Sequence, residues 1–131
     1  MKKNGLLNAQ LIQEIAAIGH TQTMVIGDVG LPVPEGVKVI DLALTPGVPS
    51  FLEVLKAVEQ ELVCESYVLA SEIKDKNPAV HEEILKVMKE YPGSYVAHEE
   101  LKRLSEKTQV IVRTGETSAY ANIVLTAGVN F

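Results

Sequence analysis

The sequence is poor in several features that would each mark a class of protein. Cys64 is the only cysteine among 131 residues, so an intramolecular disulfide is excluded and a reducing compartment is favoured. No apolar stretch approaches the ~20 residues that a membrane-spanning helix needs. The net charge is −5 and the 12 basic residues are scattered, which argues against a nucleic-acid or anionic-membrane surface. These absences predict a soluble, cytoplasmic protein with no membrane or nucleic-acid partner.

Motifs of nucleotide, metal and hydrolase chemistry are also missing. There is no G-x-x-x-x-G-K-S/T loop, no G-x-G-x-x-G after a predicted strand, and no G-x-S-x-G elbow. The three histidines stand at positions 20, 81 and 98, never at H-E-x-x-H spacing, so nothing predicts a metal site. Cys64 begins an apolar segment, where a core position is favoured over a nucleophile.

The chain does have the composition and patterning of a folded domain. Its 131 residues, 47% of them hydrophobic, fit the roughly 150 residues of one domain, so we expect a single domain over residues 1–131. Apolar periodicity predicts helices over residues 8–18, 50–62, 77–91 and 99–107. It predicts strands over residues 24–27, 37–44, 66–70, 94–97, 110–112 and 123–129. The alternation predicts an α/β fold, a three-layer α/β/α sandwich with a mostly parallel or mixed sheet.

The candidate site consists of polar residues at predicted strand ends and in loops: His20, Asp28, His98, Lys102, Tyr120 and Asn122. Ligands of such sheets bind outside the carboxyl ends of strands, and Asp28 and His98 both occupy such ends. Side chains of these kinds bind hydroxyl-rich small molecules. Histidine also exchanges protons near neutral pH, so the set is suited to acid–base chemistry.

Each candidate also has a structural interpretation, and the residues alone leave both open. His20 follows the end of a predicted helix, where a histidine commonly interacts with the helix dipole. Lys102 has the position of a solvated surface charge. The remaining four could serve as turn, helix-start or packing residues: Asp28, His98, Tyr120 and Asn122. Arg113 and Glu116 are interpreted as a structural ion pair and stay outside the candidate set.

Ordered fragments along the whole chain resemble those of one known family. They include Gly5-Leu6-Leu7-Asn8, Gly19-His20-Thr21, Asp28-Val29-Gly30-Leu31-Pro32-Val33-Pro34, Gly47-Val48-Pro49-Ser50-Phe51, Arg113-Thr114-Gly115-Glu116, Tyr120-Ala121-Asn122-Ile123 and Ala127-Gly128-Val129-Asn130-Phe131. With these fragments in this order and at this overall length, the sequence resembles the RbsD-like family of D-ribose pyranases, which also includes the fucose mutarotases.

The resemblance implies an isomerase that interconverts the pyranose and furanose forms of D-ribose without a metal or an organic cofactor. It implies a general acid at His20 and sugar contacts at five further positions: Asp28, His98, Lys102, Tyr120 and Asn122. It also implies a ring-shaped homo-oligomer, expected to be a decamer, with each pocket between neighbouring subunits, acting in ribose uptake upstream of ribokinase. Two alternatives stay open: a mutarotase for another aldose such as L-fucose, and a non-catalytic sugar-binding accessory protein of ribose uptake.

Opening a hemiacetal ring requires one proton to leave the anomeric hydroxyl and another to reach the ring oxygen. We hypothesise that His20 donates the proton to the ring oxygen. Asp28 is expected either to orient the His20 ring or to bind a sugar hydroxyl. His98 and Lys102 are four residues apart and would share one face of a helix, from which they could hold hydroxyls or help to remove the anomeric proton.

Three positions depart from the family pattern, and none is a candidate site residue. Val29 replaces alanine, Gln22 replaces aspartate and Ser118 replaces proline. Loss of proline at position 118 is expected to make the loop before Tyr120 less rigid.

Tyr120 and Asn122 alternate in the sense of a strand, so both are expected to point to the same side.

Overall fold

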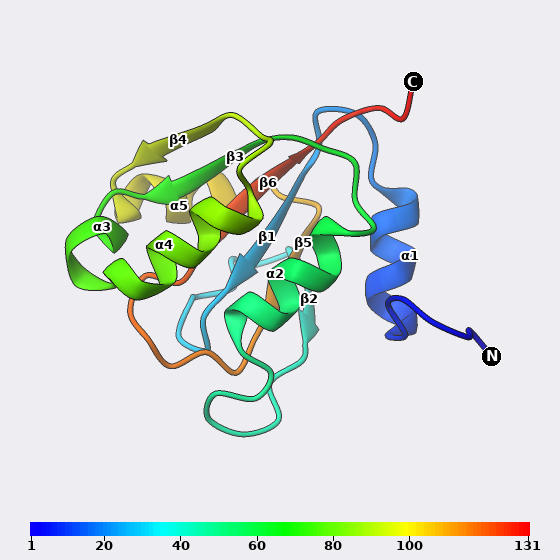
Figure 1. Ribbon diagram of the computed structural model, residues 1–131, viewed down its shortest axis with the longest axis horizontal. Coiled ribbons are helices and arrows are strands. Elements are labelled where there is room, and N and C mark those ends of the chain that lie inside the picture. The colour runs from blue at the N-terminus through cyan, green and yellow to red at the C-terminus, as the bar shows by residue number, and fades with distance from the viewer.

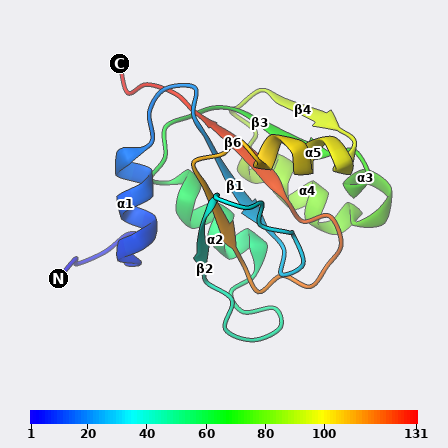
Figure 2. The ribbon, with the colours of Figure 1, turned by 180° about the vertical axis from the view of Figure 1, so that it is seen from behind.

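The computed structural model describes all 131 residues, Met1–Phe131, as a six-stranded sheet with helices on both faces (Figure 1). The helices are α1 (Ala9–Ala17), α2 (Phe51–Glu59), α3 (Ile73–Lys76), α4 (Pro78–Val87) and α5 (His98–Ser105). The strands are β1 (Thr23–Gly27), β2 (Lys38–Asp41), β3 (Cys64–Ala70), β4 (Gly93–Val96), β5 (Val110–Arg113) and β6 (Ile123–Ala127). Figure 2 shows α5 in front of the sheet and α2 and α4 behind it, which confirms the predicted three-layer sandwich.

Strand direction gives the sheet two edges of different character. The strand order is β2-β5-β1-β6-β3-β4, and all neighbouring pairs are parallel except the two that involve β6. The carboxyl ends of five strands and the amino end of β6 therefore share one edge, called the carboxyl edge below. The opposite edge, called the amino edge, holds the other ends of the same strands. The sheet is thus mixed and mostly parallel, as predicted.

Apolar side chains are buried on both faces of this sheet. A cluster of 21 buried residues packs with α1, α2 and α4, and a cluster of six packs with α5. β1 contributes to both, since Met24 and Ile26 belong to the larger cluster and Val25 to the smaller. Successive side chains of a strand point to opposite faces, so a strand covered on both faces is apolar throughout. β1 is therefore a fixed central element, and His20 and Asp28 stand beyond its two ends.

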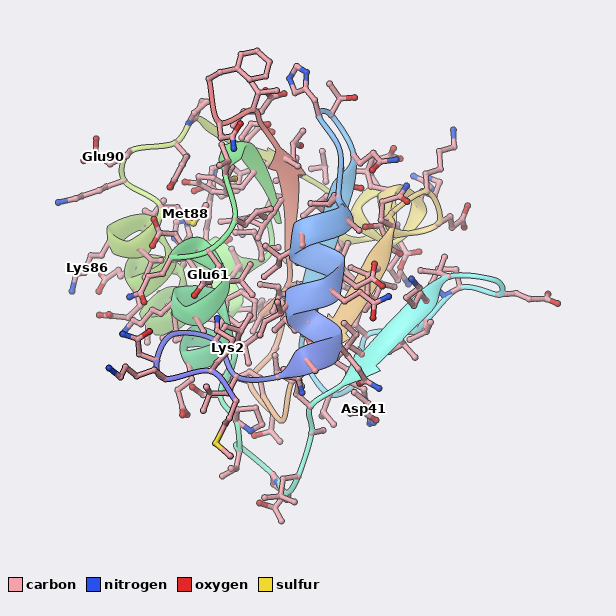
Figure 3. All side chains as sticks on the ribbon, turned by 90° about the vertical axis from the view of Figure 1, so that its right-hand side faces the viewer. Lys2, Asp41, Glu61, Lys86, Met88 and Glu90 are labelled. Carbon is pink, nitrogen blue, oxygen red and sulfur yellow. The ribbon has the colours of Figure 1, made fainter.

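Local sequence signals set the helix starts. The Asn8 side chain caps α1, and Ser50 and Glu53 form a capping box at the start of α2. Pro78 stands at the first position of α4, where its missing N–H removes no helical hydrogen bond. α1 lies beside the half of the sheet that contains β2, β5 and β1, and Figure 3 shows it from its outer side, with Asp41 at the end of β2.

Some element boundaries differ from those predicted. The strand predicted over residues 37–44 is limited to β2, because the chain leaves the sheet after Asp41. The short helix α3 precedes α4 and was not predicted. Each helix is too short or too polar to traverse a bilayer.

Cys64 is confirmed as a core residue. It is 9% exposed, and its Sγ donates a hydrogen bond to the Ser66 carbonyl oxygen at 3.3 Å. Burial raises the pKa of the thiol, which disfavours the thiolate that a nucleophile requires.

Candidate functional site

Asp28 and Asn122 meet at the carboxyl edge, where β1 ends and β6 begins. The fully buried Asn122 accepts a hydrogen bond from the Asp28 N–H at 2.9 Å, and its Nδ2 donates to Asp28 Oδ2 at 3.0 Å. Asp28 Oδ1 accepts from the Gly30 N–H at 2.9 Å. A Cβ at Gly27 would lie 2.9 Å from Asn122 Oδ1, so this close approach requires glycine. The fold therefore holds the Asp28 carboxylate in one orientation.

His98 and Tyr120 also lie at the carboxyl edge, in contact with each other. Their ring centroids are 5.0 Å apart at an interplanar angle of 84°, an edge-to-face arrangement. Nδ1 of His98 is buried and has no hydrogen-bond partner within the chain. A buried polar atom without a partner is unfavourable, so a ligand hydroxyl that reached this nitrogen would stabilise it.

Tyr120 and Asn122 do not alternate as residues of a strand, so the prediction that both point to one side is wrong. β6 begins only at Ile123, and the Asn122 N–H donates to the Tyr120 carbonyl at 2.9 Å, which closes a tight turn. Tyr120 has a φ of 57°, in the left-handed region that non-glycine residues seldom adopt. The turn sends Asn122 into the interior and leaves Tyr120 half-buried against His98.

α5 begins at His98, which confirms the structural interpretation of this histidine as a helix start. The Glu72 carboxylate accepts from the His98 N–H through both oxygens at 3.0 Å and caps a helix that has no side-chain cap of its own. Burial acts to raise the pKa of Glu72, but hydrogen bonds from its own N–H and from the His98 N–H lower it. Lys102 lies one turn later, and its Nζ is 2.7 Å from Glu99 Oε1. Lys102 is thus a partly buried, paired charge on the same helix face as His98.

Ser118 ties the loop before Tyr120 to two helices. Its Oγ accepts from Nδ2 of the buried Asn77 at 2.9 Å and donates to Glu116 Oε2 at 2.9 Å. The other Glu116 oxygen accepts from the Phe51 N–H at 3.1 Å, at the start of α2. Burial acts to raise the pKa of Glu116, but the hydrogen bonds from Ser118 and Phe51 outweigh it and lower the pKa. The hydroxyl at position 118 therefore fastens a loop that the loss of proline was expected to loosen.

The ion pair predicted between Arg113 and Glu116 is wrong. Arg113 Nη1 lies 2.8 Å from Asp41 Oδ2, and its Nε donates to the Val29 carbonyl at 3.1 Å. β5 ends at Arg113, so Glu116 already belongs to the following loop, where N–H groups occupy its carboxylate.

His20 lies at the amino edge, away from the other candidates. It precedes β1 whereas Asp28 follows it, and the five residues of β1 span ~16 Å. The His20 side chain is 50% exposed, and its Nε2 lies 2.9 Å from Glu65 Oε2. Within one chain it is therefore Glu65, and not Asp28, that contacts the His20 ring. One chain gathers the predicted sugar-binding residues at one edge and leaves the predicted acid at the other.

Two cavities of the chain lie away from the candidate residues. One of about 470 Å³ beside α1 is lined mainly by hydrophobic side chains, and one of about 560 Å³ lies between Thr21–Thr23 and α5. None of the six candidates lines either cavity. No three His, Cys, Asp or Glu side chains are grouped so that they could hold a metal ion.

Sequence patterns did not predict the contact of Glu65 with His20 or that of Glu72 with His98. Glu65 is 45 residues from His20, and Glu72 is 26 residues from His98, so no helical or strand period connects either pair. Strand pairing brings them together. The one sequence signal at Glu65 is a charged residue directly before the strand predicted over residues 66–70.

Comparison with known proteins decides the family. Residues 1–130 match the RbsD / FucU transport protein family. The chain belongs to this family. A D-ribose pyranase of Geobacillus thermodenitrificans is 52% identical over 131 residues, which cover all of this chain and 99% of that protein. A D-ribose pyranase of Pectobacterium carotovorum is 48% identical over 139 residues, which cover both chains completely.

Solved structures agree with this membership in the RbsD/FucU family. The structure of Bacillus subtilis RbsD complexed with D-ribose matches with a TM-score of 0.97 and 42% identity, covering all of both chains. The fucose mutarotase of Streptococcus pneumoniae in complex with L-fucose matches with a TM-score of 0.82 over 95% of this chain and 94% of the other. Its identity is 23%, so that match shows the shared fold alone. The resemblance inferred from the ordered fragments is confirmed.

Proposed function

We propose that this RbsD/FucU family protein is a D-ribose pyranase, an isomerase that opens the ring of D-ribose and closes it again in the other ring size. The observation that carries the proposal is 52% identity, over the whole chain, to a relative named D-ribose pyranase. The 42% identical structure of RbsD with D-ribose supports the same substrate. The geometry of the two sheet edges suits the chemistry, as the next paragraphs argue.

The carboxyl edge supplies the groups that bind the sugar. Asp28 offers a carboxylate in a fixed orientation, which suits a hydroxyl donor. Tyr120 and His98 offer a phenol and an imidazole side by side, and Lys102 offers an ammonium group one turn along α5. Asn122 is fully buried, so it contributes to sugar binding by holding Asp28. A ribose ring, which carries a hydroxyl on most of its carbons, needs several such donors and acceptors at once.

His20 is the general acid of the proposed reaction. As the bond between C1 and the ring oxygen breaks, its electron pair passes to the ring oxygen, which takes a proton from His20. The anomeric hydroxyl loses its proton to a base and becomes the carbonyl oxygen of the open chain. Attack by a different hydroxyl on C1 reverses these transfers and gives the other ring size. A positioned acid or base contributes ~10²–10⁴-fold to such a step.

The proposal requires two chains for one site, because His20 and the sugar-binding residues occupy opposite edges of the sheet. His20 of one subunit would face the carboxyl edge of its neighbour in a ring-shaped homo-oligomer, and the family resemblance favours a decamer. The proposal also includes the cytoplasm as the place of action, where ribose that has been taken up is converted before ribokinase acts on it.

Saturation-transfer NMR of D-ribose tests the proposal directly. Adding the protein should increase exchange between the pyranose and furanose signals. Enhanced exchange with L-fucose and none with ribose would show instead a mutarotase for another aldose. Ribose binding with unchanged exchange rates would show a non-catalytic sugar-binding protein and would overturn the enzymatic proposal.

A further inference from the structure

A strained turn presents His20 to the solvent. The Gln22 N–H donates to the Gly19 carbonyl at 3.1 Å, and the Gly19 N–H donates to the Gln22 side chain at 2.7 Å. Thr21 has a φ of 70°, a left-handed conformation that is an outlier for a β-branched residue. The Thr21 N–H donates to the Ala127 carbonyl at 2.9 Å, at the end of β6. Backbone strain of this kind persists where the surrounding structure imposes it, and it clusters at functional sites.

A β-bulge aims Glu65 at this turn. Cys64 and Ser66 both have partners in β6, whereas Glu65 has none in the ladder. A bulge re-aims the side chain of the extra residue, and bulges are frequent beside active sites. Here Cys64 is buried and the Glu65 side chain is 42% exposed. A Cβ at Gly128 would lie 3.3 Å from Glu65 Cβ, so the neighbouring glycine leaves room for this arrangement.

The turn and the bulge converge on one contact, the 2.9 Å hydrogen bond between His20 Nε2 and Glu65 Oε2. Both side chains are about half exposed, and ion pairs in such positions contribute little to folding stability. Folding therefore gains little from a contact that two unusual backbone geometries produce. The contact does fix the ring, because with Nε2 engaged only Nδ1 is left to meet a substrate.

We infer that Glu65 is a positioning residue for His20. The Glu65 carboxylate accepts a hydrogen bond from Nε2–H of His20, so Nδ1 of His20 is the nitrogen that exchanges a proton with the sugar. The inference rests on the proposed function, in which His20 is the general acid. During ring opening Nδ1–H gives its proton to the ring oxygen, and Nδ1 takes a proton back from the hydroxyl that closes the new ring. The Nε2–H group stays hydrogen-bonded to Glu65 throughout, so the His20 ring neither rotates nor changes tautomer between the two steps.

The first test reads the tautomer of His20 in the full oligomer. Histidine labelled with ¹⁵N in both ring positions is observed by NMR, and His20→Ala identifies the His20 signals by their loss. We expect the neutral ring of the wild type to carry its proton on Nε2. In Glu65→Ala a mixture of the two tautomers is expected. A wild-type ring protonated on Nδ1, or an unchanged tautomer in Glu65→Ala, overturns the inference.

The second test separates positioning from sugar binding. Glu65→Ala should lower kcat for ribose interconversion about tenfold or more, because an unheld ring loses part of the advantage of a positioned acid. The KM for ribose should change less than about twofold, since Glu65 does not contact the sugar. Glu65→Gln keeps a side-chain oxygen that can accept from Nε2–H, so it should retain more activity than Glu65→Ala.

Glu83→Ala is the matched control, because Glu83 is also 42% exposed and also forms a single ion pair, with Lys86. It should leave kcat unchanged. A wild-type kcat in Glu65→Ala, or a raised KM with unchanged kcat, overturns the inference. If the wild-type protein fails to accelerate ribose exchange, the proposed function is wrong, whereas the tautomer measurement still decides whether Glu65 holds the ring.

Discussion

The two edges of the sheet are built in different ways. At the carboxyl edge, buried Asn122 binds Asp28 through two hydrogen bonds, and a network through Ser118 fastens the neighbouring loop. At the amino edge, the His20 side chain is half exposed and has Glu65 as its hydrogen-bonded side-chain partner. One chain thus assembles the proposed binding surface by itself, whereas it presents the proposed acid, His20, to the solvent. A group presented outward, far from its own binding surface, is suited to a substrate held by another chain.

The largest expected effect comes from removing the proposed acid at the amino edge. His20→Ala should lower the rate of pyranose–furanose exchange by ~10²–10⁴-fold, the usual contribution of a general acid or base. Stability should change by less than ~0.5 kcal/mol, because the side chain is half exposed. NMR exchange measures the first quantity, and light scattering with thermal unfolding checks that the oligomer is intact. Full activity in this variant would show that His20 is not the acid.

Mixing two inactive variants tests whether the two edges of different chains meet. Asp28→Ala removes the carboxylate of the carboxyl edge, and His20→Ala removes the proposed acid of the amino edge. If a site combines the edges of two subunits, oligomers assembled from both variants contain some intact sites. Random assembly should restore about a quarter of the wild-type activity, because each intact site needs the right chain on both sides. Verified mixed oligomers without activity would place both edges of a site in one chain.

Asn122→Ala should show how far the carboxyl edge depends on internal hydrogen bonds. The variant leaves the Asp28 N–H without its partner, which should cost ~1–3 kcal/mol in the free energy of unfolding. The KM for ribose should rise, since nothing then fixes the carboxylate. Asn4→Ala, at an exposed position, is the matched control and should change neither quantity. A destabilised variant with an unchanged KM would limit Asn122 to folding.

The sequence predicts well those features that residues close together in the chain determine. The predicted helices over residues 8–18 and 77–91 and the predicted strand over residues 24–27 are confirmed, because neighbours in the chain set them: the Asn8 cap, Pro78 at the start of α4 and the apolar run of β1. Parallel strands with covered faces place their polar ends at a common edge, so the position of Asp28 follows from periodicity alone. The family resemblance rests on residues that lie along the whole chain, and it needs no contact to be known.

Features set by strand pairing or by unusual backbone are not predictable in this way. The contact of Glu65 with His20 depends on a β-bulge, and no residue type at that position predicts a bulge. The turn at residues 120–122 depends on a positive φ at a tyrosine, which residue preferences disfavour. No structural role was predicted for Gln22, and Ser118 was expected to loosen its loop. Each instead contributes a hydrogen bond that holds a loop.

The smallest expected effect is a pH-dependent change in stability at the carboxyl edge, where Glu116 holds the loop before Tyr120. Hydrogen bonds from Ser118 and Phe51 lower the pKa of Glu116 below its ordinary value of 4.5. A carboxyl whose folded-state pKa is depressed contributes stability above its unfolded-state value and loses it as pH falls through the folded-state value. The Tm of Glu116→Gln should therefore lie below that of the wild type at neutral pH, and the gap should narrow as pH falls below 4.5.

Thermal unfolding across that range measures the gap, with Glu90→Gln as the control at an exposed position. The control should follow the wild type at every pH. A gap that stays constant on acidification would mean that the Glu116 carboxylate gains nothing from its hydrogen bonds. The loop of the carboxyl edge would then be held by Asn77 and Ser118 alone, and the charge at position 116 would have no part in preparing the binding surface.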